Sequence, residues 1–198
     1  MLLSDVAVLR TGAVLSRLQV SENSDACFRY DVLNLRNIDE TGRIHRSDCI
    51  QVCLREQVQP DTITEPDDIL VRLSYPYTVI YIDSECDCGL LVPSHFGIVR
   101  TKGDILPKYL YAILDSSVAR KDFALNASGS TILGTISIKN IGTIQVPLAS
   151  VERQQLIGCY HNYAKKEIRL LEDLTNEKAR LLSLTNKKII GQAKGERV

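Results

Sequence analysis

Gly129-Ser130-Thr131-Ile132-Leu133-Gly134 opens the stretch of sequence that decides the fold. A strand-like Ile136-Ser137-Ile138 follows, and then a second short strand that carries a proline, Ile144-Gln145-Val146-Pro147-Leu148. From Val151-Glu152-Arg153-Gln154-Gln155 to Ile190 the apolar residues recur with the spacing of a helix. The sequence therefore predicts a compact domain that ends in a short strand and continues into one long helix.

Length and composition allow one well-buried core. The chain has 198 residues, of which 44% are apolar and 24% charged, and no apolar run approaches the roughly 18 residues that cross a bilayer. The first ten residues contain Asp5 and no cationic lead-in, so they do not read as a secretory signal. We therefore expect a cytoplasmic protein with no membrane segment, whose six cysteines are reduced thiols.

Net charge is zero, but the charged residues are unevenly distributed. Basic and acidic residues number 7 and 7 in residues 1–55, 2 and 8 in 56–100, 5 and 3 in 101–150, and 10 and 6 in 151–198. The segment balances are thus 0, −6, +2 and +4. A strongly cationic nucleic-acid binder is excluded for the whole chain, but a local arginine patch is not.

Residues 1–149 read as an α/β (α+β) domain: a mixed, strongly twisted sheet with short helices. The clearest strand is Thr78-Val79-Ile80-Tyr81-Ile82, because every residue in it is β-branched or aromatic. Further strands are expected at 30–35, 49–54, 69–73 and 94–100. Short helices are expected at 106–116, where a proline suits the first turn, and at 118–125.

The helix expected at 150–191 is too long and too apolar along one side to remain uncovered in water, and residues 192–198 are expected to form a flexible tail. At 1.5 Å per residue the helix would extend about 60 Å. Its apolar side is an imperfect coiled-coil seam, diluted by Lys178 and Thr185. The residues expected to be buried in a dimer are Ile157, Tyr160, Ala164, Ile168, Leu171, Leu174, Leu181, Leu182 and Ile189.

Two arrangements would cover this seam. The helix could fold back as a hairpin onto its own domain, or it could pack against a second long helix from another copy or a partner. We favour the second, since an isologous contact with its own twin is the simplest cover for such a stripe.

Seven short segments of the chain occur in the order found in one known family. They are Asp5-Val6-Ala7 with Arg10-Thr11-Gly12, Val32-Leu33-Asn34-Leu35-Arg36-Asn37-Ile38, Asp67-Asp68-Ile69-Leu70-Val71-Arg72, Leu106-Pro107-Lys108-Tyr109-Leu110-Tyr111-Ala112-Ile113-Leu114, Gly129-Ser130-Thr131, Ile144-Gln145-Val146-Pro147-Leu148 and Glu152-Arg153-Gln154-Gln155. Each is unspecific alone, but together they span nearly the whole chain. On these segments the chain resembles the specificity subunit of Type I restriction–modification systems, in a half-length form.

The resemblance implies a target-recognition domain at 1–149 and a dimerisation and spacer helix at 150–191. It implies a homodimer that reads a split site in double-stranded DNA, one half-site per copy, without altering it. It also implies docking of a methyltransferase subunit, with a translocating nuclease (restriction) subunit added in some systems. No cofactor is expected.

Three loops supply the expected DNA contacts. The first holds four side chains around a turn that could reach phosphates or guanine edges: Arg36, Arg43, His45 and Arg46. The second lies between two strands and contains Arg72, Ser74, Tyr75 and Tyr77. The third is Ser128, Gly129, Ser130 and Thr131, where glycine permits close approach to a phosphate. The competing interpretations are surface ion pairs for the arginines and core packing for the two tyrosines.

The sequence contains no recognisable catalytic motif. We find no Walker-type phosphate loop, no Gly-x-Ser-x-Gly and no methyl-donor motif. The histidines His45, His95 and His161 stand far apart, with no spaced carboxylate or serine partner. Cys49, Cys53, Cys86 and Cys88 could meet His45 around zinc, but neither spacing is the usual Cys-x2-Cys, so no metal is expected.

One rival class remains. A recognition domain that no longer reads DNA would leave a protein-interaction module, whose helix only docks a partner. The acidic balance of residues 56–100 is the best support for this alternative.

Overall fold

The computed structural model describes residues 1–20, 27–83, 87–103, 105–127 and 134–195, with the side chains of the last helix as far as residue 190. It divides into two compact units, Met1–His161 and Asn162–Val198. The boundary between these two units lies inside the last helix. Among the described residues, no helix combines the length and apolarity that a membrane span requires.

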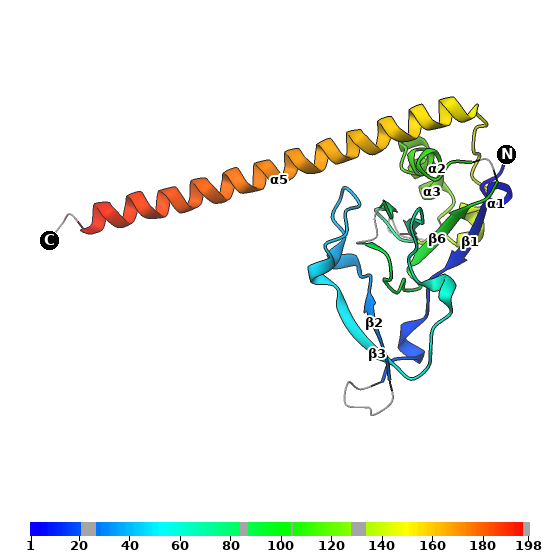
Figure 1. The fold of residues 1–198 in the computed structure, drawn as a ribbon, viewed down its shortest axis with the longest axis horizontal. Helices are drawn as coiled ribbons and strands as arrows, with labels where there is room; N and C mark the ends of the chain where they lie inside the picture. The colour runs from blue at the N-terminus through cyan, green and yellow to red at the C-terminus, as the bar shows by residue number, and fades with distance from the viewer. Residues whose placement is uncertain (21–26, 84–86, 104, 128–133, 196–198) are drawn as a thin grey trace. The chain divides into compact units, whose positions relative to one another are not determined.

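The first unit is built on a four-stranded antiparallel sheet with the order β1-β6-β4-β5 (Figure 1). Its strands are β1 (Ala7–Thr11), β4 (Ile69–Arg72), β5 (Val79–Tyr81) and β6 (Phe96–Thr101). A separate antiparallel hairpin joins β2 (Phe28–Val32) to β3 (Ile50–Leu54). The structure has a strand in each of the five predicted strand segments. Segments 49–54, 69–73 and 78–82 contain β3, β4 and β5 completely, and segments 30–35 and 94–100 contain most residues of β2 and β6.

Alternation along the strands gives the sheet two buried faces. Ile69, Val71 and Val99 point to one face, where helices α2 and α3 cover them. Leu70, Ile98 and their neighbours point to the other face, which loop residues cover. This layering explains why the strands read as nearly continuous apolar runs.

The helices of the first unit are short. They are α1 (Leu3–Val6), α2 (Pro107–Leu114), α3 (Ser117–Leu125) and α4 (Ile138–Ile141), with 3-10 turns η1 (Leu15–Arg17), η2 (Leu35–Asn37), η3 (Arg46–Asp48) and η4 (Pro60–Thr62). Pro107 occupies the first turn of α2, as its fixed φ predicts. The mixed α+β class predicted from the sequence is confirmed.

Two predicted strands of the stretch that opened the sequence analysis are wrong. Ile136-Ser137-Ile138 is not a strand, because the Ser137 hydroxyl accepts a hydrogen bond from the Asn140 N–H and caps α4 instead. Residues 144–148 form only an isolated bridge between Gln145 and Leu2. Pro147 has no N–H to extend that pairing.

Helix α5 (Val151–Gly195) begins one residue after Ser150, whose hydroxyl accepts a hydrogen bond from the Arg153 N–H. It continues past the end predicted at residue 191. Its first turns belong to the first unit, where Gly158 makes the closest approach to α2. A Cβ on Gly158 would lie 2.8 Å from the Tyr109 backbone nitrogen, so only glycine allows this packing.

Candidate nucleic-acid interface

The basic loop, residues 34–49, connects β2 to β3 and is ordered by its own side chains. The Asn34 side chain accepts a hydrogen bond from the Arg36 N–H at 2.8 Å, and the Asn34 N–H donates to Asn37 Oδ1 at 2.9 Å. Isolated pairing of Ile38 with Ile44 closes a turn between them. This geometry brings together the first predicted group, Arg36, Arg43, His45 and Arg46.

Asp39 holds the centre of the basic loop. One carboxylate oxygen accepts hydrogen bonds from the Thr41 N–H and hydroxyl and from the Arg43 N–H, and the other lies 3.1 Å from His45 Nε2. Partial burial opposes ionisation of Asp39, but the hydrogen bonds from Thr41, Arg43 and His45 outweigh it and lower its pKa. The carboxylate thus remains charged and fixes the turn that presents the arginines.

The arginines differ in exposure. Arg36 and Arg46 are exposed, while Arg43 and His45 are half-buried. Arg46 Nη1 donates to the Cys88 carbonyl at 2.9 Å, which orients the guanidinium. Arg36 and Arg46 are therefore the cationic groups of this loop that solvent reaches most readily.

The tyrosine turn, residues 74–77, joins β4 to β5. Arg72 Nε donates to the Ser74 hydroxyl at 3.2 Å, and the Tyr77 N–H donates to the Ser74 carbonyl. Tyr75 is 53% exposed, whereas Tyr77 is 4% exposed and donates its hydroxyl to the Gly134 carbonyl at 2.9 Å. Tyr77 is therefore packed in the core, as the competing interpretation expects, whereas Tyr75 is exposed.

The tyrosine turn and the basic loop meet at one edge of the sheet. Gly42 of the loop has φ +78° and lies so close to β5 that a Cβ there would be 2.6 Å from the Val79 carbonyl oxygen. Val79 follows Tyr77 by two residues, so the loop lies beside the end of the turn. The basic loop and the exposed Tyr75 are thus carried by neighbouring segments of the fold.

The third predicted group, Ser128, Gly129, Ser130 and Thr131, lies outside the described residues. The residues that follow this group are described from residue 134 onward. Thr135 pairs with Ser74, and the Ile136 N–H donates to the Leu73 carbonyl at 2.8 Å. The described residues next to the third group therefore lie beside the tyrosine turn.

His95 also lies near the tyrosine turn, a position that no local sequence pattern indicates. Its carbonyl accepts the Leu73 N–H at 2.9 Å and its ring packs on Phe96, with centroids 4.6 Å apart. Burial, and then the charge of Arg72, lower the pKa of His95, so the imidazole is neutral at pH 7. Its pairing with β4 backbone across the sheet could not be read from local sequence.

Two histidines have carboxylate partners, contrary to the sequence expectation. His45 pairs with Asp39 in the basic loop, and His161 Nε2 lies 3.1 Å from Asp115 Oδ2. Asp115 is 4% exposed and also accepts hydrogen bonds from Arg120. The second pair comes from residues 46 positions apart, and it ties the first turns of α5 to the end of α2.

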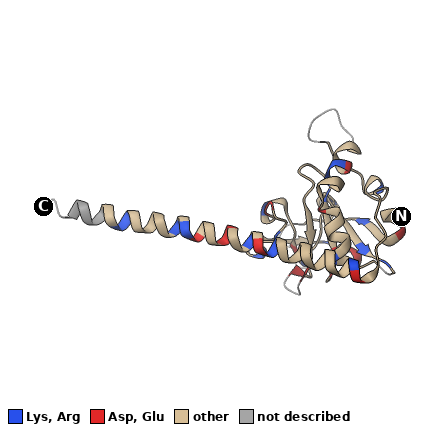
Figure 2. Cartoon of the chain, turned by 90° about the horizontal axis from the view of Figure 1, so that it is seen from above, with Lys and Arg blue, Asp and Glu red and all other residues tan. Residues whose placement is uncertain are grey.

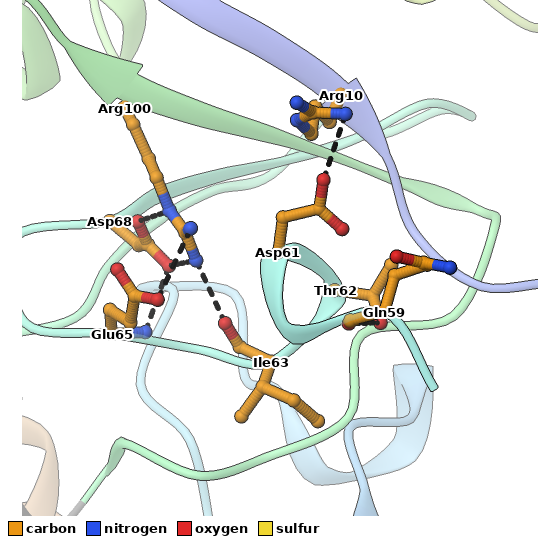
Figure 3. Close-up of polar contacts among 8 residues, drawn as sticks. All are labelled: Arg10, Gln59, Asp61, Thr62, Ile63, Glu65, Asp68 and Arg100. Atoms are coloured by element: carbon orange, nitrogen blue, oxygen red, sulfur yellow. Dashed lines mark hydrogen bonds and ion pairs between the residues drawn. The ribbon is translucent and has the colours of Figure 1, made fainter. Parts of the chain in front are cut away.

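The acidic surplus of residues 56–100 is largely used in internal ion pairs (Figure 3). Asp68 binds Arg100 with both oxygens, at 2.7 and 3.1 Å, and Glu65 lies 3.3 Å from the same guanidinium. Arg10 pairs with Asp61 at 2.8 Å. Outside this group, Asp83 pairs with Lys108 at 3.3 Å. The −6 balance of this segment is therefore not a free acidic surface.

Helix α5 leaves large apolar side chains uncovered in the second unit. The leucine stripe comprises Leu170, Leu174, Leu181 and Leu184 at coiled-coil spacing, flanked by Leu171, Leu182 and Ile189, and each is 51–68% exposed. Basic and acidic residues are interspersed along the rest of the helix (Figure 2). Of the predicted seam, Tyr160, Ile168, Leu171, Leu174, Leu181, Leu182 and Ile189 are exposed, whereas Ile157 and Ala164 are half-buried.

Within the part of the chain that the structure describes, no three metal-ligating side chains come together. Cys49 instead accepts a hydrogen bond from the Asn37 amide at 2.8 Å. Cys86, one of the four cysteines considered for zinc, lies outside the described residues.

No family model matches the chain, and no curated protein matches it by sequence. Solved structures do match. The HsdS subunit from Thermoanaerobacter tengcongensis has a TM-score of 0.61 at 15% identity, over 89% of this chain and 44% of that one. The S subunit of a Type I restriction–modification system from M. genitalium has a TM-score of 0.56 at 15% identity, over 88% and 40%.

A third match comes from a structure of a type I restriction–modification system described for its complex assembly and conformational transition. Its TM-score is 0.58 at 12% identity, over 90% of this chain and 40% of that one. The chain thus spans less than half the length of the structures that it resembles. At these identities the likeness shows the fold, and the fold implied by the sequence resemblance is confirmed.

Proposed function

We propose that the chain is a DNA-recognition subunit of a Type I restriction–modification assembly. It reads one half of a bipartite site in double-stranded DNA and has no catalytic role of its own. Two copies pair through α5, and the pair docks a methyltransferase subunit, to which a nuclease subunit is added in some assemblies. The first unit is the target-recognition domain, and α5 is the spacer.

The structural similarity to HsdS is the main support for this proposal, because the similarity extends beyond the first unit into helix α5. Met1–His161 makes up 161 of 198 residues, or 81% of the chain. A match over 89% of the chain must therefore extend into the second unit, which is helix. A shared recognition fold alone would support DNA binding, whereas a shared domain and helix supports the role of a spacer subunit.

The surface formed by the basic loop and the tyrosine turn is suited to DNA. Arg36 and Arg46 supply exposed guanidinium groups, which bind phosphates or the O6 and N7 of guanine. Tyr75 presents an exposed ring braced edge-to-face by Tyr77, with centroids 6.1 Å apart. Arg72 adds a third guanidinium, oriented by Ser74.

The leucine stripe supports pairing of two helices. A stripe of seven large apolar residues, each more than half exposed, has a strong tendency to be covered. A second copy supplies the same stripe, and the mixed charges beside it permit pairing in either direction. The rival interaction module loses part of its support, since four carboxylates of the acidic segment, Asp61, Glu65, Asp68 and Asp83, pair with arginine or lysine within the chain.

The test is DNA binding by the chain in complex with its methyltransferase, measured by fluorescence anisotropy at several salt concentrations. Adenine-methylation mapping first supplies the split motif for the probe. The variant Arg36→Gln with Arg46→Gln removes two exposed cations from the basic loop. Arg55→Gln is the matched control, because Arg55 is 61% exposed in its side chain but lies beyond the other end of the hairpin, beside Glu56.

We expect the double variant to bind at least tenfold more weakly and to flatten the slope of log K against log salt by about 2, one unit for each lost phosphate contact. The control should retain both values within twofold. Salt-independent binding, or equal losses in the variant and the control, would contradict DNA reading by this surface. Absence of any split methylated motif would contradict the assembly.

A further inference from the structure

Two thiols and a guanidinium meet on the outer face of the β2–β3 hairpin. Arg29 of β2 faces Cys53 of β3 in the strand register, and Cys27 precedes β2 by one residue. Alternation puts the three side chains on the same face, opposite the core cluster that contains Val32 and Leu54. The three groups are close enough to shift one another's pKa: Cys27 and Cys53 raise the pKa of Arg29, and Cys27 raises the pKa of Cys53.

The two thiols differ in access to solvent. Cys27 is half-buried, whereas Cys53 is only 5% exposed. The neighbouring Cys27 thiol, then burial, raise the pKa of Cys53. Contact with Cys27, then with Cys53, raises the pKa of Arg29, which means that the guanidinium and a thiolate stabilise each other. Cys27 is thus the thiol placed to react first, and Cys53 is the thiol placed to resolve.

We propose that Cys27 and Cys53 form an oxidisable pair that hydrogen peroxide converts into a disulfide. The Cys27 thiolate attacks peroxide, the O–O bond breaks, and Cys27 sulfenic acid and hydroxide are formed. Cys53 then attacks the sulfenic sulfur, and the S–O bond breaks with release of water. In total two thiols lose two electrons and two protons, and one peroxide becomes two waters.

The position of Cys27 permits this bond. A residue diagonal to its partner in a regular ladder lies about 7–8 Å away between Cα atoms, beyond the usual reach of a disulfide. Cys27 lies outside the ladder of β2, which starts at Phe28, so strand hydrogen bonds do not hold its backbone at that spacing. The disulfide would staple the open end of the hairpin whose closed end is the basic loop.

The test uses the full-length chain, reduced and then treated with a small excess of peroxide. Trypsin releases Cys27 in peptide 18–29 and Cys53 in peptide 47–55, which also holds Cys49. Non-reducing mass mapping should find these two peptides linked within a monomeric chain. Cys49→Ser removes the ambiguity and should leave the link intact.

Two variants test whether Cys53 and Arg29 take part in the oxidation of Cys27 or merely lie near it. Cys53→Ser should accumulate a dimedone-reactive sulfenic acid on Cys27, since nothing resolves it. Arg29→Gln should slow the loss of the Cys27 thiol about tenfold, because it removes the cation beside the reacting sulfur. Arg55→Gln, a nearby exposed arginine, should leave that rate unchanged.

Cys159 provides the internal reference, because it is an exposed cysteine in the same molecule. The proposal requires Cys27 to react with peroxide faster than Cys159 does. Equal rates for the two, a disulfide to any other cysteine, a disulfide between chains, or a rate unaffected by Arg29→Gln would each overturn it. These readouts do not depend on DNA binding, so they stand apart from the proposed function.

Discussion

Replacing two leucines of the leucine stripe with serine should separate the two copies of the chain. Leu174 and Leu181 are 52% and 64% exposed. Full burial of a leucine stabilises by about 2 kcal/mol, so covering these exposed fractions contributes about 1.0 and 1.3 kcal/mol per copy. Two copies lose about 4.6 kcal/mol in Leu174→Ser with Leu181→Ser, equivalent to roughly three orders of magnitude in Kd. This is an upper value, since a helix pair leaves part of each side chain at its rim.

Sedimentation equilibrium over a range of concentrations measures this Kd directly. The matched control is Glu172→Ser with Lys187→Ser, two exposed residues of the same helix that lie outside the stripe. Both pairs carry the same loss of helix propensity, about 0.5 kcal/mol per serine. Circular dichroism checks that helix content is equal in the two variants.

The expected result is a Kd raised by about a hundred- to a thousandfold in the leucine variant and by less than threefold in the control. Equal shifts in both variants would mean that serine acts through helix stability, not through the stripe. A wild-type chain that stays monomeric up to on the order of 100 μM would contradict self-pairing, since the stripe alone predicts tighter association.

Three further changes test the fold around the proposed interface. Asp68→Asn removes the buried carboxylate that binds the partly buried Arg100 with both oxygens and should cost about 2–4 kcal/mol, seen as a drop in Tm of roughly 5–15 °C, whereas the more exposed Asp61→Asn should cost under about 1 kcal/mol. Gly42→Ala places a Cβ against the Val79 carbonyl at positive φ and should cost about 1–3 kcal/mol, with amide exchange accelerated mainly in the basic loop. Because the folded-state pKa of Asp39 is lowered, its stabilising contribution is fully present above the ordinary Asp value and is lost as pH falls through the folded value. Amide exchange in the loop should therefore rise only on acidification below the ordinary Asp range, and Asp39→Asn should abolish that pH dependence.

The strands could be predicted because a strand buried on both faces of its sheet has an almost continuous run of apolar residues in the sequence. Segments such as Thr78–Ile82 are apolar and β-branched throughout, and the structure places Val79–Tyr81 in the sheet. The prediction failed at Ile136-Ser137-Ile138, where the same residue types occur but one serine caps a helix. Capping depends on whether the following N–H groups turn toward the hydroxyl, which composition does not determine.

The site was partly predictable for a different reason. Arg36, Arg43, His45 and Arg46 lie in one loop because they are close in sequence. Tyr75 and Tyr77 would point the same way in a strand, but Tyr77 has φ +55°, and the chain reverses between them. His161 meets Asp115 only because α5 docks beside α2, a contact of 46 residues' separation that no local pattern records.

In the first turns of α5, the side of the helix that docks on the domain is not the most hydrophobic side. Leu156 and Tyr160 are 70% and 75% exposed, whereas the adjacent Gln154 and Gly158 are buried. Both polar atoms of the Gln154 side-chain amide form hydrogen bonds to backbone groups. The oxygen accepts one from the Leu106 N–H at 2.9 Å, and the nitrogen donates one to the Ala149 carbonyl at 3.0 Å. Docking thus relies on a small residue that permits close approach and on a polar residue that satisfies backbone groups. Ile157 also packs against the core, but only in part, whereas Leu156 and Tyr160 remain outside the contact. The largest exposed apolar side chains of these turns therefore do not mark the surface that docks on the domain.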